Sequence, residues 1–203
     1  MPASGGSATI CGHPIADEMD QISQIMGVCP QHDILWDQLT GKEHIELFAR
    51  IKGAAGTAVN VEQEVSERLR DVLLEKDGEA RAGAYSGGMK RRLSVALSLV
   101  GDPRVVFLDE PTTGMDPVTR ADVWRMIERV KHGRSIVLTT HSMEETDVLA
   151  DKITVMADGQ LIAIGTALSL KNKFGSGLRL SLFAPVASQD AVTTAVQDMW
   201  KQH

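Results

Sequence analysis

Two adjacent carboxylates, Asp109 and Glu110, follow the apolar run Val105–Leu108. Such a run predicts a buried strand, and in open α/β sheets ligands bind where the carboxyl ends of strands emerge into a crevice. Acidic side chains at that place suit phosphate chemistry. Taken alone, the pair is also typical of a helix cap or of a surface pair, so its interpretation depends on the rest of the sequence.

A second candidate lies upstream, at Ser86, Gly87 and Gly88. Serine is a natural N-cap, and two glycines let a ligand approach the backbone closely. The start of a helix presents unpaired N–H groups and a partial positive charge, which suit an anion such as a terminal phosphate. A plain helix cap is the commoner meaning of such a turn, but here one helix joins it to the strand that ends in two carboxylates.

The stretch from Tyr85 to Pro117 resembles, almost without a break, the signature motif, Walker B strand and D-loop of ATP-binding-cassette (ABC) ATPases. Gln31 follows an expected strand directly and is similar to the glutamine of the family's Q-loop. His141 ends another expected strand and is similar to the histidine of its H-loop. These matches identify the chain as a member of the ABC family by resemblance.

The resemblance implies the residues of an ATP-hydrolysing site, with ATP and Mg²⁺ as ligands. Asp109 would bind Mg²⁺, directly or through water. Gln31 would complete the shell around the metal and the attacking water. Glu110 would orient and polarise that water, and His141 would hydrogen-bond the γ-phosphate.

The resemblance also implies partners. Ser86, Gly87 and Gly88 would bind the γ-phosphate of ATP held by a second nucleotide-binding domain, in a head-to-tail dimer. Asp116 would lie between the two sites and couple them. Through the loop of Gln31, ATP hydrolysis would drive transmembrane domains at the cytoplasmic face of a membrane.

Several features resemble subfamily A, whose members mostly move lipids or sterols. Tyr85 stands where many ABC proteins have leucine, and Met89 stands where many have glutamine. The phrases at 27–37 and 170–175 are also similar to those of subfamily A. A lipid is therefore the expected transported substrate.

One part of the family pattern is missing from the first thirty residues, which contain no GxxxxGK[ST] loop. By resemblance this Walker A loop would precede the strand expected at 8–11, so we expect a chain truncated before the loop. Without the backbone cradle for the α- and β-phosphates, it would be inactive alone. We also expect a missing strand beside the one that ends at Asp109, which would expose apolar edges and make the chain marginally stable.

The elements that position these residues follow from apolar periodicity and from capping residues. Strands are expected at 8–11, 25–29, 105–109 and 135–140, the last two buried, with a hairpin around Asp158-Gly159. Helices are expected at 40–52, 61–75, 86–100 and 166–174, and after Asp116 and Ser142.

Some finer expectations concern single positions in these helices. A capping box of Thr40 and Glu43 begins the first helix, and Gly53 ends it. Ile45, Phe48 and Ile51 would share its buried face. The run Lys90-Arg91-Arg92 would be a solvated face.

The fold implied is α/β, a P-loop NTPase (RecA-like) parallel sheet with an inserted ABC helical subdomain at about residues 38–100. Residues 1–175 would form a partial ABC ATPase domain. Residues 176–203, with alternating leucines and then a helix-like pattern at 187–200, would begin a small α+β C-terminal regulatory domain.

Composition is that of an ordinary globular protein of 203 residues, with 43% hydrophobic residues and a net charge of −6. The negative charge disfavours a nucleic-acid partner. Cys11 and Cys29 form neither a disulfide framework nor a metal-binding spacing. We expect no signal peptide and no membrane-spanning segment within this sequence.

Two other functions stay open. One is a soluble ABC ATPase in translation or DNA maintenance, which coiled-coil arms or a second cassette with a basic tail would favour. The sequence contains neither. The other is a non-catalytic fragment whose signature turn binds the ATP of a partner. Substitution of Glu110 distinguishes this hypothesis from that of a catalytic domain.

Overall fold

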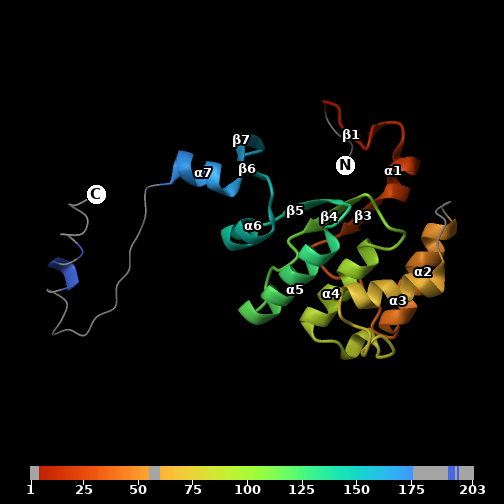
Figure 1. Ribbon diagram of the computed structural model, residues 1–203. Coiled ribbons are helices and arrows are strands. Elements are labelled where there is room, and N and C mark those ends of the chain that lie inside the picture. The colour runs from red at the N-terminus through yellow and green to blue at the C-terminus, as the bar shows by residue number, and fades with distance from the viewer. Residues whose placement is uncertain (1–4, 55–59, 176–191, 195, 197–203) are drawn as a thin grey trace. The chain divides into compact units, whose positions relative to one another are not determined.

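The computed structural model describes residues 5–54, 60–175, 192–194 and 196. The chain divides into two compact units, residues 1–153 and 154–203, and each is described by itself. The chain contains both helices and strands, and a helix follows each strand of the parallel sheet (Figure 1). Within the described ranges, no helix is long and apolar enough to cross a bilayer.

The first unit is built on a three-stranded parallel sheet in the order β3-β4-β5. Its strands are β3 (Met26–Cys29), β4 (Val105–Asp109) and β5 (Ser135–Thr139), close to the predicted ranges. Leu108 of β4 pairs with Cys29 on one side and with Leu138 on the other. The expectation that a strand is missing beside β4 is therefore wrong, because β3 and β5 pair with its two edges.

Helix α4 (Gly87–Ser98) lies directly on β3. A Cβ atom at Gly27 of β3 would lie 1.8 Å from the carbonyl oxygen of Ser98, so only glycine lets the two backbones come this close. Helix α5 (Pro117–Val130) packs beside α4 on the same side of the sheet (Figure 1). The following residues of the two helices are buried in the core: Leu93, Ala96, Leu97, Val123, Ile127 and Val130.

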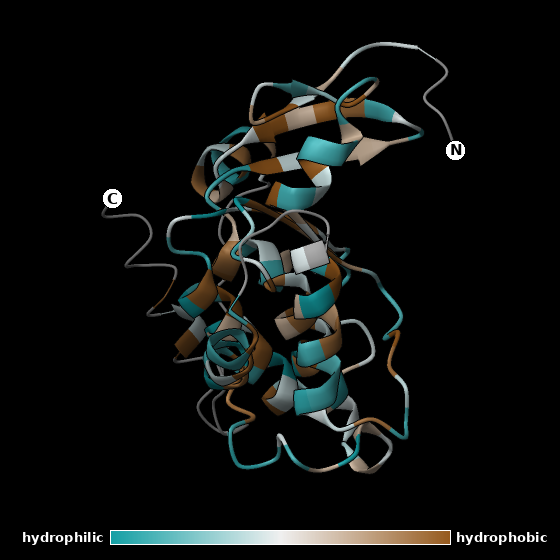
Figure 2. Cartoon of the chain, turned by 90° about the vertical axis from the view of Figure 1, so that its right-hand side faces the viewer, coloured by the Kyte–Doolittle hydropathy of each residue, from teal (hydrophilic) through white to brown (hydrophobic). Residues whose placement is uncertain are grey.

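Helices α2 (Gly41–Ala54) and α3 (Val61–Asp71) pack against each other and against α4. Figure 2 shows helices of the chain that carry hydrophilic residues on one side and hydrophobic residues on the other. The predicted capping box is confirmed at the start of α2. The N–H of Thr40 donates to Oε2 of Glu43 at 2.7 Å, and the N–H of Glu43 donates to Oγ1 of Thr40 at 3.1 Å.

Three finer expectations about α2 and α3 are wrong. Helix α2 does not end at Gly53 but includes it. Ile51 is 56% exposed, because six residues along a helix turn it away from the buried face of Ile45. Helix α3 ends earlier than residue 75, because Leu73 adopts the left-handed conformation with φ 57°.

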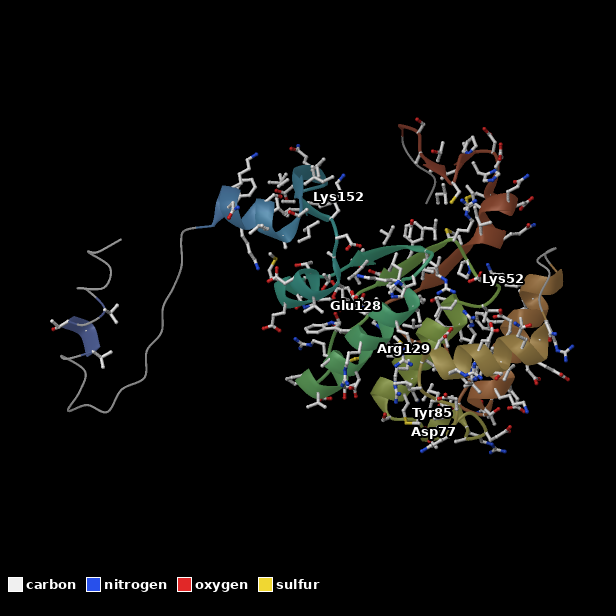
Figure 3. All side chains as sticks on the ribbon, in the orientation of Figure 1. Lys52, Asp77, Tyr85, Glu128, Arg129 and Lys152 are labelled. Atoms are coloured by element: carbon white, nitrogen blue, oxygen red, sulfur yellow. The ribbon has the colours of Figure 1, made fainter. Side chains whose placement is uncertain are left out.

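The N-terminal part contains a helix that the sequence did not indicate, α1 (Met19–Ile25). The short strands β1 (Thr9–Ile10) and β2 (His13–Pro14) pair antiparallel before it. Lys52 of α2, labelled in Figure 3, donates to the carbonyl oxygens of Ser23 at 2.6 Å and Met26 at 2.9 Å. Partial burial lowers the pKa of Lys52. This side chain links α2 to the start of β3.

The segment before α4 is anchored through Tyr85. It follows a short 3₁₀ helix, η1 (Ala82–Ala84), and is 6% exposed. Its hydroxyl donates to the carbonyl oxygen of Asp77 at 2.7 Å, and the two residues lie together in Figure 3. The residue that precedes the turn at Ser86 is therefore part of the core.

The second unit contains the predicted hairpin, formed by β6 (Ile153–Ala157) and β7 (Gln160–Gly165). Asp158 and Gly159 both have positive φ, as a tight hairpin turn requires. Helix α7 (Ala167–Phe174) follows and packs against β7. The boundary at residue 175 stays a prediction. The alternating leucines and most of residues 187–200 lie outside the described residues.

One face of the parallel sheet is exposed. Val28, Phe107 and Val137 are aligned across β3, β4 and β5, and the two valines are 53% and 46% exposed. The expectation that 135–140 is a buried strand is therefore wrong in part. Only the face with Ile136 and Leu138 packs against the core.

We expect the 203-residue chain to self-associate through this face and its strand edges. Replacing Val28 and Val137 with threonine keeps β-propensity and should reduce association, measured by light scattering. Val118→Thr, at a 73% exposed position on a helix, is the matched control and should have no effect. A monomeric unmodified chain with one sharp thermal transition would contradict the expectation.

Candidate functional site

The predicted site residues follow the carboxyl ends of three neighbouring strands. Gln31 lies just beyond β3, Asp109 ends β4 with Glu110 next, and His141 lies just beyond β5. Because the strands are parallel and in register, these ends meet at one edge of the sheet. The predicted placement of Asp109 and His141 at one edge is confirmed.

Glu110 and His141 are in direct contact. Nδ1 of His141 lies 2.6 Å from Oε2 of Glu110, and the hydroxyl of Thr113 donates to the same oxygen. The imidazole is 72% exposed, whereas the Glu110 side chain is 23% exposed. An imidazole that donates its Nδ1–H to Glu110 has its Nε2 facing away from this bond. The arrangement orients the ring from behind and leaves its other nitrogen for a ligand.

Thr139 is a site residue that sequence reasoning missed. Its hydroxyl donates to Oδ1 of Asp109 at 2.5 Å and accepts from the N–H of Glu110 at 3.1 Å. Its carbonyl oxygen accepts from the same N–H, also at 3.1 Å. No sequence motif marks it, because its role follows from its place opposite Asp109 in the register of β5.

Glu110 has an unusual backbone conformation. Its φ is 46°, in the left-handed region that costs a residue other than glycine about 1–3 kcal/mol. The hydrogen bonds from its N–H to Thr139 hold it there. The turn aims its carboxylate at His141, so the strain is located at the residue expected to do the chemistry.

The oxygen ligands at this edge fit Mg²⁺ better than a transition metal. Asp109 and Gln31 are exposed. No group of three His, Cys, Asp or Glu side chains in the described part is arranged around a common metal position. Mg²⁺ commonly takes one or two protein oxygens and completes its shell with phosphates and water. Cys29 is buried nearby, and burial raises the pKa of its thiol to about 11.

The glycines of the predicted signature turn differ in their surroundings. Oγ of Ser86 accepts from the N–H of Met89, so Ser86 is the N-cap of α4 as predicted. A Cβ at Gly87 would have no atom within 4 Å, whereas a Cβ at Gly88 would lie 2.4 Å from Cγ2 of Thr119. Gly88 therefore serves the contact of α4 with α5, and Gly87 leaves the approach to the helix open.

Asp116 is the N-cap of α5, as the sequence predicts. Its Oδ1 accepts from the N–H groups of Val118 at 3.0 Å and Thr119 at 3.1 Å. Hydrogen bonds from the side chain and the backbone of Thr119 lower the pKa of Asp116. A role in coupling two sites stays a prediction.

Helix α6 (Met143–Leu149) follows His141 and is anchored by Glu145. The sequence predicts Ser142 and Glu145 as a cap, and Oγ of Ser142 does accept from the N–H of Glu145. The Glu145 side chain is instead fully buried, and its Oε1 accepts from Thr112 at 2.8 Å and Trp124 at 2.9 Å. A hollow of about 380 Å³ is lined by residues 112–114, Arg120 and residues 140–144.

The expectation that Lys90, Arg91 and Arg92 form a solvated face is wrong for Arg91. Its side chain is buried and donates to the carbonyl oxygens of residues near the strand ends. Arg92 donates to the carbonyl oxygens of Val72 and Leu73. Three consecutive positive charges predicted exposure to solvent. Because α4 lies on the sheet, however, position 91 faces the core.

The family model described as ABC transporter matches residues 1–113. The chain belongs to the ABC transporter family. It corresponds to the ATP-binding domain of an ABC A-family transporter.

Similar curated proteins include A family members from Arabidopsis thaliana. ABC transporter A family member 2 is 56% identical over 179 residues, covering 87% of this chain and 18% of its own length. A family member 6 is 46% identical over 198 residues, covering 97% of this chain and 21% of its own length. The chain thus spans about a fifth of these relatives.

A solved structure shares the fold. It is described as the ATP binding subunit of an ABC transporter, and it superposes with a TM-score of 0.69 at 24% sequence identity. The match covers 85% of this chain and 71% of the other. It supports a mixed α/β ABC fold with a parallel three-stranded sheet.

The contact between Gly88 and Thr119 predicts a specific stability effect. Gly88→Ala should lower the free energy of unfolding by about 1–3 kcal/mol, because the new methyl meets a stiff β-branched side chain. In the double variant Gly88→Ala/Thr119→Ser, the clashing methyl of Thr119 is absent, and the free energy of unfolding should be restored. Gly87→Ala, the control, should be neutral or stabilise the helix. Urea titration of the Val28→Thr/Val137→Thr chain measures this, and no recovery in the double variant would contradict it.

Proposed function

We propose that this chain is the ATP-hydrolysing part of a subfamily A ABC transporter and couples hydrolysis to transport of a lipid across a membrane. One observation carries the ATPase assignment. Gln31, Asp109-Glu110 and His141 lie at or just beyond the carboxyl ends of three adjacent parallel strands, and the Glu110 carboxylate contacts His141 at 2.6 Å.

Glu110 would act as the base toward the attacking water. Its carboxylate already has Oε2 occupied by His141 and Thr113, which fixes its direction. Oε1 would accept the hydrogen bond from water and polarise it for attack on the γ-phosphate. His141 would donate to the γ-phosphate through Nε2–H while its Nδ1–H is donated to Glu110, so the imidazole in this role would carry a proton on both nitrogens.

Asp109 and Gln31 would hold Mg²⁺, which when bound neutralises phosphate charge. Thr139 donates to one oxygen of Asp109 and so orients the carboxylate. Gln31 lies on the loop beside it and would reach the metal and the water from the β3 side. The two residues leave the remaining coordination to phosphate oxygens and water.

The start of α4 would bind the γ-phosphate of an ATP on a second nucleotide-binding domain. Ser86 and Gly87 are exposed, and the space next to Gly87 is open. A helix start offers N–H donors to an anion. Asp116, exposed at the start of α5, would lie near the same dimer interface and couple the two sites.

The larger assembly follows from the relatives, of which the chain covers about a fifth. Transmembrane domains would contact the loop after Gln31, at the cytoplasmic face of the membrane. The phrases at 27–37 and 170–175 support subfamily A and hence a lipid as transported substrate.

Glu110→Gln should reduce ATP turnover about 10²–10⁴-fold, because an amide cannot accept the proton, while ATP binding is kept. The test host is Arabidopsis A family member 2 with its matching 179 residues replaced by those of this chain. Glu144→Gln is the control, since Glu144 is acidic, 79% exposed and near His141 but outside the proposed machinery.

Phosphate release and binding of ATP in Mg²⁺-free buffer give the two readouts. Unchanged turnover in Glu110→Gln would refute the role of Glu110 as base and favour the fragment that only lends its signature turn. Stimulation by lipid in reconstituted vesicles, lost in the same variant, would support the lipid assignment.

A further inference from the structure

We propose that Arg91 is a positioning residue of this site, because its guanidinium joins the end of β3, the end of β4 and the loop after Glu110. The inference rests on the function proposed above and adds a residue to it. Arg91 touches neither of the carboxylates expected to do the chemistry.

Arg91 donates four hydrogen bonds to backbone carbonyl oxygens outside its own helix. Nε donates to the carbonyl oxygen of Pro111 at 2.8 Å, and one terminal nitrogen donates to that of Asp109 at 2.8 Å. The other terminal nitrogen donates to the carbonyl oxygens of Pro30 at 2.6 Å and Gln31 at 3.3 Å. One planar group with five N–H donors thus holds two strand ends at a fixed separation.

The charge of Arg91 is balanced by one acid. The residue is 3% exposed, and a buried cation is costly unless it is paired. Oδ1 of Asp33 lies 3.3 Å from its terminal nitrogen. Because Asp33 is two positions after Gln31, the ion pair extends the contact along the loop of Gln31.

A second buried arginine, Arg68, shows that burial alone does not explain why Arg91 contacts the backbone of the strand ends. It is 5% exposed and pairs with three acids of its own helix, Glu64, Glu67 and Asp71. Its contact outside α3 is with the carbonyl oxygen of Leu99. Arg68 therefore joins two helices, whereas Arg91 joins the segments that carry the proposed Mg²⁺ ligands.

The same helix carries the signature turn. Arg91 lies in α4, which begins next to Ser86, so the group that holds the strand ends moves together with the start of that helix. Misplacing a reacting group by about 1 Å can cost about 100-fold in rate. Loss of Arg91 should therefore affect turnover more than it affects the affinity for ATP.

Lysine should not replace Arg91. Its ammonium is a point charge and cannot reach carbonyl oxygens on both strand ends at once. Arg91→Lys keeps the positive charge near Asp33 but lacks the planar guanidinium. The variant therefore separates the role of the charge from that of the guanidinium hydrogen bonds. Arg92→Met is the matched control, because Arg92 is the next residue and donates to carbonyl oxygens at 72 and 73, away from the site.

The first measurement is hydrogen exchange of the 203-residue chain in the Val28→Thr/Val137→Thr background. Arg91→Met and Arg91→Lys should both raise exchange in peptides that cover 26–36 and 108–113. Arg92→Met should raise it only near 72–74. An unchanged rate in the first two peptides, or an equal rise throughout the chain, would overturn the proposal.

The second measurement is ATP turnover in the chimeric full-length host described above. Arg91→Met and Arg91→Lys should each lower kcat about 100-fold while KM and ATP affinity change little. Arg92→Met should leave kcat unchanged even where it lowers Tm. Equal kcat for the Arg91 variants and the unmodified chimera would overturn the positioning role. A chimera that does not hydrolyse ATP with Arg91 present would refute the proposed function instead, and the exchange result would then decide the role of Arg91.

Discussion

The contact between Gly27 and Ser98 determines how the first unit is arranged. A Cβ at Gly27 would lie 1.8 Å from the Ser98 carbonyl oxygen, so β3 and α4 meet backbone to backbone. This approach places position 91 of α4 over the ends of β3 and β4, within reach of their carbonyl oxygens. A larger residue at 27 would lift the helix away from the sheet. It would leave carbonyls and a cation without partners.

The site depends on hydrogen bonds made by side chains that the proposed chemistry does not use. Thr139 joins Asp109 to the N–H of Glu110, and Glu145 joins the loop at Thr112 to the helix that follows His141. Each bond crosses from one strand end or loop to the next. Because such groups are buried or bonded to backbone, they restrict the loops without reducing the exposure of the reactive side chains.

Much of the fold could be predicted because local signals and burial agreed. The helix N-caps at Thr40, Ser86 and Asp116 could be predicted from the sequence, because a small polar residue before an amphipathic run usually accepts a hydrogen bond from the first turn of the helix. The roles of Arg91 and Thr139 were not readable. Both depend on which backbone atoms lie opposite them in three dimensions, and neither residue type indicates this. The expectation of a further strand beside β4 rested on family resemblance and was wrong, because both edges of β4 are paired with β3 and β5.

The two glycines of the signature turn show how one short motif serves two purposes. Gly88 is required by the fold, because Thr119 occupies the space where its side chain would be. Gly87 meets nothing within 4 Å, so packing within this chain does not require it to be glycine. A residue that costs helix stability and has no internal reason to be small is best explained by the approach of a ligand or a partner. The strained φ of Glu110 supports the same argument. This conformation costs about 1–3 kcal/mol, and hydrogen bonds from the N–H of Glu110 to Thr139 maintain it. Their effect is to direct the Glu110 carboxylate toward His141.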